Sequence, residues 1–208
     1  MNRDDTLAAA LLDVRKAYRL LYGFHRRVFD MARTIDGCLD GFTFNGSDSG
    51  YSFLGDKWKP QKKRICYWDA LPFYSTYFLW IKCKDLANLE KKSWHVNASD
   101  RLFGIEMVVD DLADSAEECD PESFGQPESA KTTVRFFFGR ALVERDHVSI
   151  KDAWDVDVEE TEVVTRSDDG SFVLWREDID MVTLATKADV ISSIRAFIAK
   201  AESALKSA

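Results

Sequence analysis

An apolar stripe with a seven-residue repeat runs through residues 7–39, and it constrains the fold more than any other feature of the chain. Three sets of positions carry it: Leu7, Val14, Leu21, Val28 and Ile35; Ala10, Ala17, Phe24, Met31 and Cys38; and Leu11, Tyr18, His25, Ala32 and Leu39. Thirteen of these fifteen residues are apolar, and the other two are a Tyr and a His. Residues at this spacing lie on one side of a helix, so the stripe predicts an amphipathic α-helix over about 6–37.

The predicted helix is long for a chain of 208 residues. At a rise of about 1.5 Å per residue it would extend for nearly 50 Å, which exceeds the width of a small domain. Such a helix either bends near Gly23, projects from the body, or pairs with a second copy. If it pairs, we expect Leu21, Phe24 and Val28 to anchor a dimer interface.

The rest of the chain reads as strands followed by one more helix. Residues 101–110, 132–144 and 171–176 have the alternating or continuous apolar patterns of strands, and 167–170 reads as the turn before the last of them. Thr186 and Asp189 have the spacing of a capping box, which predicts a C-terminal amphipathic helix. Because helices do not alternate with the strands, we predict an α+β fold: a mainly antiparallel sheet flanked by a long N-terminal helix and an amphipathic C-terminal helix.

Several local features complete this prediction. Turn-forming residues between aromatic pieces suggest a hairpin or a pair of loops within 41–64. Residues 85–94 suit a short helix, and Gly139 suits a β-bulge inside its strand. Val182–Ala185 suits a short final strand.

The length suits a single domain over 1–208. Its clearest interruption is the segment 110–130, which carries eight acidic residues, no basic residue, two prolines and a glycine. Low hydrophobicity and charge repulsion predict a mobile loop or linker there. The sequence leaves open whether this segment separates two subdomains.

The net charge of −8 hides an asymmetry between the two halves of the chain. Residues 1–92 carry 16 basic and 11 acidic residues, a balance of +5, whereas 93–208 carry 12 and 25, a balance of −13. Either the halves face each other or simply diversify the surface, or one or both of them meet a charged partner. We see no secretory signal, no apolar run long enough to span a membrane, and no CxxC motif, so we expect a cytoplasmic protein with reduced thiols and no membrane partner.

Motifs that carry chemistry are missing from the sequence. It has no P-loop, no dinucleotide-binding glycine motif and no nucleophile elbow, and its three histidines are far apart. We therefore expect neither a cofactor nor a metal. Glu106, Asp110 and Asp111 are the nearest approach to a cation site, but solvated loop charge explains them better. An enzyme whose site is assembled from dispersed residues remains an alternative hypothesis, because such a site leaves no local spacing.

Two basic clusters, at 15–33 and 57–64, raise a second alternative. In the first cluster Arg19, Arg26 and Arg33 are spaced by seven and so share one helix face; in the second, Lys62, Lys63 and Arg64 follow Trp58 and precede Tyr67 and Trp68. Basic residues beside aromatic ones can follow a phosphate backbone and stack on bases, which would make the chain a nucleic-acid-binding protein. The acidic pI of about 5.0 argues against it.

The hypothesis that fits the sequence best is a non-enzymatic protein-interaction module that dimerises through its N-terminal helix. Its partner would be another protein or a second copy of this chain, with nucleic acid as the alternative partner.

Overall fold

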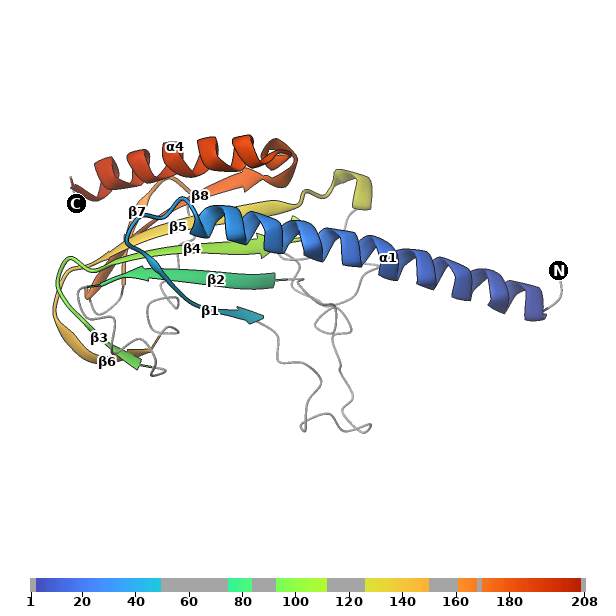
Figure 1. Ribbon diagram of the computed structural model, residues 1–208, viewed down its shortest axis with the longest axis horizontal. Coiled ribbons are helices and arrows are strands. Elements are labelled where there is room, and N and C mark those ends of the chain that lie inside the picture. The colour runs from blue at the N-terminus through green and yellow to red at the C-terminus, as the bar shows by residue number, and fades with distance from the viewer. Residues whose placement is uncertain are drawn as a thin grey trace.

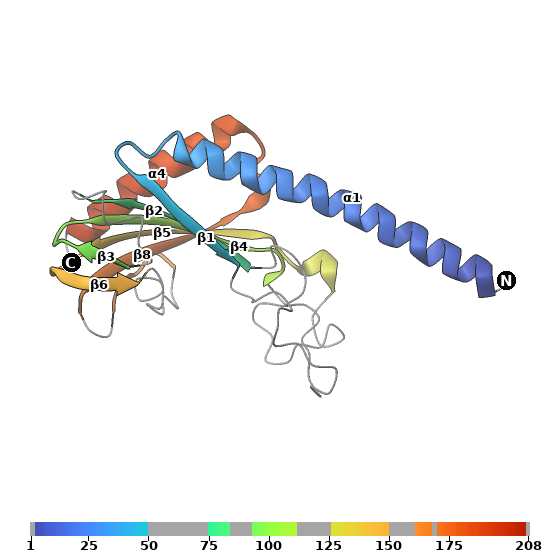
Figure 2. The same cartoon turned by 60° about the horizontal axis from the view of Figure 1, so that its bottom comes forward.

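The computed structural model describes residues 3–49, 75–83, 93–111, 126–149, 161–167 and 170–206. It shows an α+β fold in which two helices, α1 (Arg3–Asp36) and α4 (Lys187–Lys206), cover one face of an antiparallel sheet (Figures 1 and 2). This confirms the predicted fold class.

Among the described residues the main sheet has six strands in the order β1-β2-β4-β5-β8-β7, and each neighbouring pair is antiparallel. Its strands are β1 (Thr43–Ser49), β2 (Ser75–Lys82), β4 (Arg101–Val108), β5 (Thr133–Ala141), β8 (Phe172–Asp180) and β7 (Val164–Arg166). The strands predicted within 101–110, 132–144 and 171–176 are therefore present. A separate two-stranded ladder joins β3 (Ser93–Val96) to β6 (Arg145–Ser149).

Two local predictions were wrong. Gly139 forms no bulge, because the pairing runs through it without a shift, opposite Leu102 on one side and Leu174 on the other. The segment predicted as a last strand is the 3-10 helix η4 (Met181–Leu184). It turns because the Asp180 carboxylate accepts a hydrogen bond from the Val182 backbone N–H at 2.9 Å.

Other predictions fall partly outside the described residues. β1 pairs with β2, and residues 50–64 of the predicted hairpin lie outside the described ranges, as do residues 84–92. The acidic segment 110–130 connects β4 to β5. Where the segment begins and ends, the Asp111 carboxylate accepts a hydrogen bond from the Lys131 backbone N–H at 2.7 Å. A second 3-10 helix, η3 (Pro127–Ser129), lies within the segment. Residues 112–125 are not described.

The core fills the space between the sheet and the two helices. Phe197 of α4 lies against three rings of the sheet, with centroid distances of 5.9 Å to Phe103, 5.3 Å to Phe136 and 5.2 Å to Trp175. All four side chains are buried. Burial of large aromatic groups on this scale is the main force that holds α4 on the sheet.

The predicted capping box starts α4. The Asp189 backbone N–H donates to the Thr186 hydroxyl at 3.2 Å, and the Thr186 backbone N–H donates to the Asp189 carboxylate at 2.8 Å. Backbone N–H groups at both ends of the box are satisfied in this way, which explains why the helix begins where the sequence indicates.

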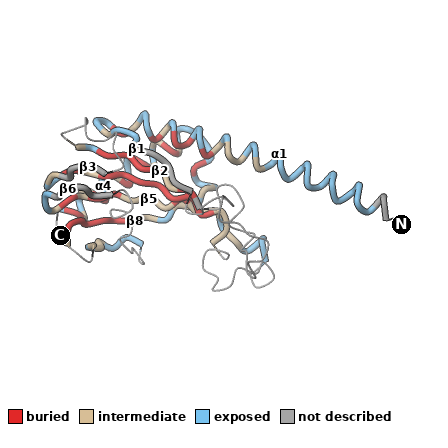
Figure 3. Tube along the Cα trace, turned by 90° about the horizontal axis from the view of Figure 1, so that it is seen from below, coloured by how far each residue is buried: buried red, intermediate tan, exposed pale blue. Residues whose placement is uncertain are grey.

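Helix α1 is covered by the body along only part of its length. Val28 and Ile35 are fully buried, whereas Leu7 is 60% exposed and Tyr18 is 70% exposed. The N-terminal part of the helix extends beyond the sheet, as Figures 1 and 2 show, and Figure 3 shows the change from buried to exposed along it. We call residues 6–22 the arm.

Candidate interaction surface

The exposed side chains of the arm and the buried side chains of α1 belong to the same sequence stripe but face different directions. An ideal α-helix has 3.6 residues per turn, so side chains spaced by seven residues change direction around the helix axis by about 20° per heptad. From Leu7 to Ile35 the drift reaches about 80° over four heptads. The face that lies on the sheet at Ile35 has therefore rotated away from it at Leu7, and one flat sheet cannot cover the whole stripe.

Large aliphatic and tyrosine side chains form an exposed strip along the arm. The members of this arm strip are Leu7, Leu11, Val14, Tyr18 and Tyr22, all of them exposed. At about 100° per residue they fall within an arc of about 80° on one side of α1. Phe29 lies on the same side further along the helix and is 43% exposed. The arm strip thus leads along α1 towards the body of the protein.

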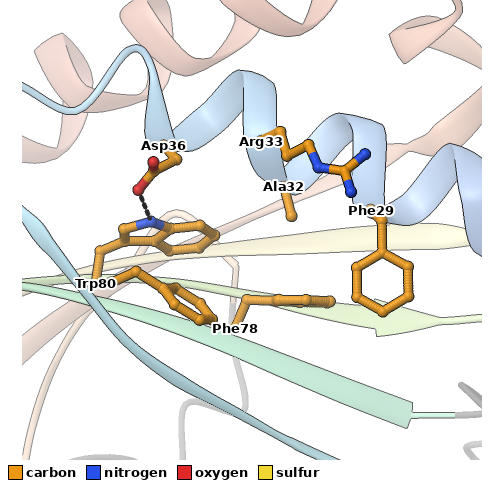
Figure 4. Close-up of a pocket in the computed structure, with 7 residues that line it drawn as sticks. Phe29, Ala32, Arg33, Asp36, Phe78 and Trp80 are labelled. Carbon is orange, nitrogen blue, oxygen red and sulfur yellow. Dashed lines mark hydrogen bonds between the residues drawn. The ribbon is translucent and has the colours of Figure 1, made fainter.

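Where the strip reaches the body it meets a pocket of about 270 Å³ between α1 and the edge formed by β1 and β2. Figure 4 shows its walls, in which aromatic rings predominate. The lining residues are Phe29, Ala32, Arg33, Asp36, Phe44, Phe78 and Trp80. Phe44 packs on Trp80 with a centroid distance of 5.3 Å, and Phe29 meets Phe78 edge-on at 6.1 Å.

Both charged groups of the pocket have partners within the chain. The Arg33 guanidinium donates to the Asp30 carboxylate at 2.9 Å, and the Asp36 carboxylate accepts a hydrogen bond from the Trp80 indole at 2.8 Å. The mouth is therefore close to electrically balanced, and the walls are aromatic. A pocket of this kind suits an apolar or aromatic side chain of a partner better than a charged one.

The three residues predicted to anchor an interface are not equally available. Val28 is fully buried in the chain's own core, and Phe24 is partly buried against that core. Leu21 is half-buried at the point where the helix leaves the body. Val28 belongs to the chain's own buried core, so the accessible part of the stripe lies further towards the N-terminus.

The structure describes only the first of the two predicted basic clusters. Arg19, Arg26 and Arg33 are exposed on α1. However, Arg26 and Arg33 share the carboxylate of Asp30, at 3.9 Å and 2.9 Å, so much of their charge is balanced locally. The second set, Lys62, Lys63 and Arg64, lies outside the described residues.

The acidic residues considered for a cation do not form a cation site. Glu106 is paired with Arg135 at 3.3 Å, and the Asp111 carboxylate is engaged by the backbone of Lys131. Within the described ranges no group of three or more acidic, His or Cys side chains is arranged to hold a metal. None of the described helices is long and apolar enough to cross a membrane.

Comparison with known proteins gives one result. The family model PM0109 matches residues 4–206. No curated protein and no solved structure matches the chain. Because the match covers nearly the whole sequence, the chain belongs to the PM0109 family.

Proposed function

We propose that this member of the PM0109 family is a non-enzymatic protein-interaction module that forms a homodimer through the arm of α1. One observation carries the proposal: the arm strip exposes three large aliphatic side chains and two tyrosines on one side of a helix that its own sheet does not cover. Contiguous exposed apolar surface of this kind is typical of a protein–protein contact site.

The repeat of the stripe favours a helix as the partner. In a left-handed pair of helices the slight supercoil removes the drift of about 20° per heptad, so positions repeated every seven residues stay in contact. A sheet offers no such correction. The stripe keeps its heptad spacing along the arm as well as along the buried part of α1, which supports a second helix lying on the arm.

The distribution of charge along α1 favours an antiparallel arrangement of the helices of two copies. Residues 3–13 hold one basic and three acidic residues, a balance of −2, whereas 14–27 hold five basic residues and no acidic one, a balance of +5. A parallel pair would place like charges side by side. An antiparallel pair places the acidic end of each helix near the basic part of the other, which is favourable.

The cytoplasm is the location that we propose for this dimer. Cys38, which is half-buried, forms no disulfide with any of the described residues. A reduced thiol at this position is consistent with a reducing compartment.

Light scattering after size-exclusion chromatography tests the dimer directly. We expect the wild type to elute as a salt-stable dimer and the double variant Leu11→Asp/Val14→Asp to elute as a folded monomer, because two charges would enter the apolar seam. The matched control is Leu20→Asp, since Leu20 is 76% exposed on the opposite side of the same helix and its variant should remain dimeric. A monomeric wild type over the accessible concentration range would refute the proposal.

The alternative of nucleic-acid binding rests on the exposed row of Arg19, Arg26 and Arg33. The same chromatography distinguishes it when absorbance is recorded at two wavelengths, for protein and for nucleic acid. Bound nucleic acid that high salt removes, and that Arg19→Glu weakens, would favour this alternative over the dimer.

A further inference from the structure

We propose that the protein binds a small oxyanion in a second pocket, beneath the C-terminal end of α4. The pocket has a volume of about 190 Å³, and its lining residues are Arg101, Arg140, Glu202, Leu205 and Lys206. It lies at the opposite end of the chain's helical layer from the arm and does not depend on the proposed dimer.

Two of the cations face each other across neighbouring strands. Arg101 is the first residue of β4 and is directly paired in register with Arg140 of β5. Residues two apart on a strand point to the same face of the sheet. Arg101 is two residues from the buried Phe103, and Arg140 is two residues from the buried Phe138, so both arginines lie on the helix-covered face. Like charges directly opposite each other on adjacent strands destabilise a sheet unless an opposite charge joins them.

The guanidinium of Arg140 lacks a partner for one of its donors. Its Nε is buried and makes no hydrogen bond to any described residue. None of the ion pairs between described residues includes Arg101, Arg140 or Lys206. Burying a charged donor without an acceptor is costly, and an oxyanion in the pocket would supply the missing acceptor.

The charges of the lining do not cancel. Arg101, Arg140 and Lys206 contribute three positive charges, and Glu202 contributes one negative charge. The carbonyl groups at the end of α4 add a partial negative charge of about one half, which still leaves the pocket positive. A monovalent or divalent anion therefore completes the balance.

Guanidinium groups define the chemical class of the ligand. Arg presents a planar fork of N–H donors that matches a carboxylate or a phosphate with two parallel hydrogen bonds. Two such forks and one ammonium group around a small cavity fit a single phosphate or carboxylate group, either as a free ion or as the end of a small metabolite.

Calorimetric titration with inorganic phosphate at constant ionic strength tests this site. We expect binding by the wild type and an affinity at least about tenfold lower in Arg140→Gln, which corresponds to the loss of one charge-assisted hydrogen bond. Lys206→Gln provides a second variant at an exposed position whose change should not affect folding. Arg19→Gln, on the arm, is the matched control and should bind like the wild type.

A parallel titration with acetate separates the two ligand chemistries. Binding of either ion that both pocket variants weaken supports the proposal, and the stronger ion identifies the class. The absence of a binding signal for both ions, or binding that Arg140→Gln and Lys206→Gln leave unchanged, would overturn it.

Discussion

The indole Nε1 of Trp80 donates a hydrogen bond to the Oδ1 of Asp36 at 2.8 Å, and this contact fastens the last residue of α1 to β2. Trp80 is buried, so its N–H has no access to bulk water. The bond satisfies that donor at the position where the helix meets the sheet edge. It therefore helps to fix the direction in which the arm leaves the body.

Replacing Asp36 with Ala should destabilise the fold by about 1–2 kcal/mol, because the buried indole N–H of Trp80 would lose its acceptor. Urea denaturation followed by fluorescence measures the change. Asp36→Asn keeps a carbonyl acceptor and should cost less. The control is Asp13→Ala, which removes only an exposed pair with Lys16; an equal loss in that variant would contradict the role given to the Trp80 contact.

Gly139→Ala and Gly23→Ala should have opposite effects on the stability of the fold. A Cβ at Gly139 would lie 2.9 Å from Leu102 Cγ and 2.9 Å from Leu174 Cδ2, both in buried side chains, so we expect a loss of about 1–3 kcal/mol. A Cβ at Gly23 meets nothing within 4 Å, and Ala favours a helix over Gly by about 1 kcal/mol. Thermal unfolding checks both expectations: the midpoint should fall in Gly139→Ala and rise in Gly23→Ala.

The capping box should make stability depend on pH at the acidic end. Hydrogen bonds from the side chain and the backbone of Thr186 lower the pKa of Asp189. Because the folded-state pKa is below the unfolded one, this contribution is complete above the unfolded pKa of about 4 and is lost as the pH falls through the folded pKa.

Unfolding of Asp189→Asn measured between neutral and strongly acidic pH tests this expectation. The stability difference from the wild type should be largest at neutral pH and should shrink in acid. Thr186→Val removes the hydroxyl donor, so the stability of this variant, like that of Asp189→Asn, should depend less on pH than that of the wild type. A difference that stays constant over the whole range would contradict the assignment.

Removing residues 2–18 should abolish dimerisation without unfolding the body. The side chains described in this stretch are all exposed, so the deletion removes little buried surface. We expect a monomer whose unfolding midpoint in urea, at a protein concentration where the wild type is monomeric, stays close to the wild-type value. Loss of the cooperative transition would instead show that the arm contributes to the core.

Local patterns in the sequence predicted the main elements of the fold. The stripe that includes Val28 and Ile35 indicated α1, and the spacing of Thr186 and Asp189 indicated the start of α4. These signals are local, because they depend on helix periodicity and on hydrogen bonds within one turn. The antiparallel sheet followed from the order of the elements.

The candidate sites were not predictable in the same way. The aromatic pocket joins Phe29 to Phe44 and Trp80, and the oxyanion pocket joins Arg101 to Arg140 and Lys206. These neighbours depend on strand register and on helix docking between distant segments, which leave no spacing in the sequence.

Val28 has the heptad spacing of the exposed arm positions, yet it is buried. The heptad positions looked equivalent, but the drift of about 20° per heptad makes successive positions face different surroundings along a helix.

The placement of α1 and α4 on the same face of the sheet has a consequence for synthesis. The apolar side of α1 is made first, yet the strands that cover it come later in the chain. The aromatic side chains of β4 and β5 likewise stay uncovered until α4, which carries Phe197, has been made. A nascent chain must therefore carry uncovered apolar surface until α4 has left the ribosome, so chaperone capture should matter most before that point.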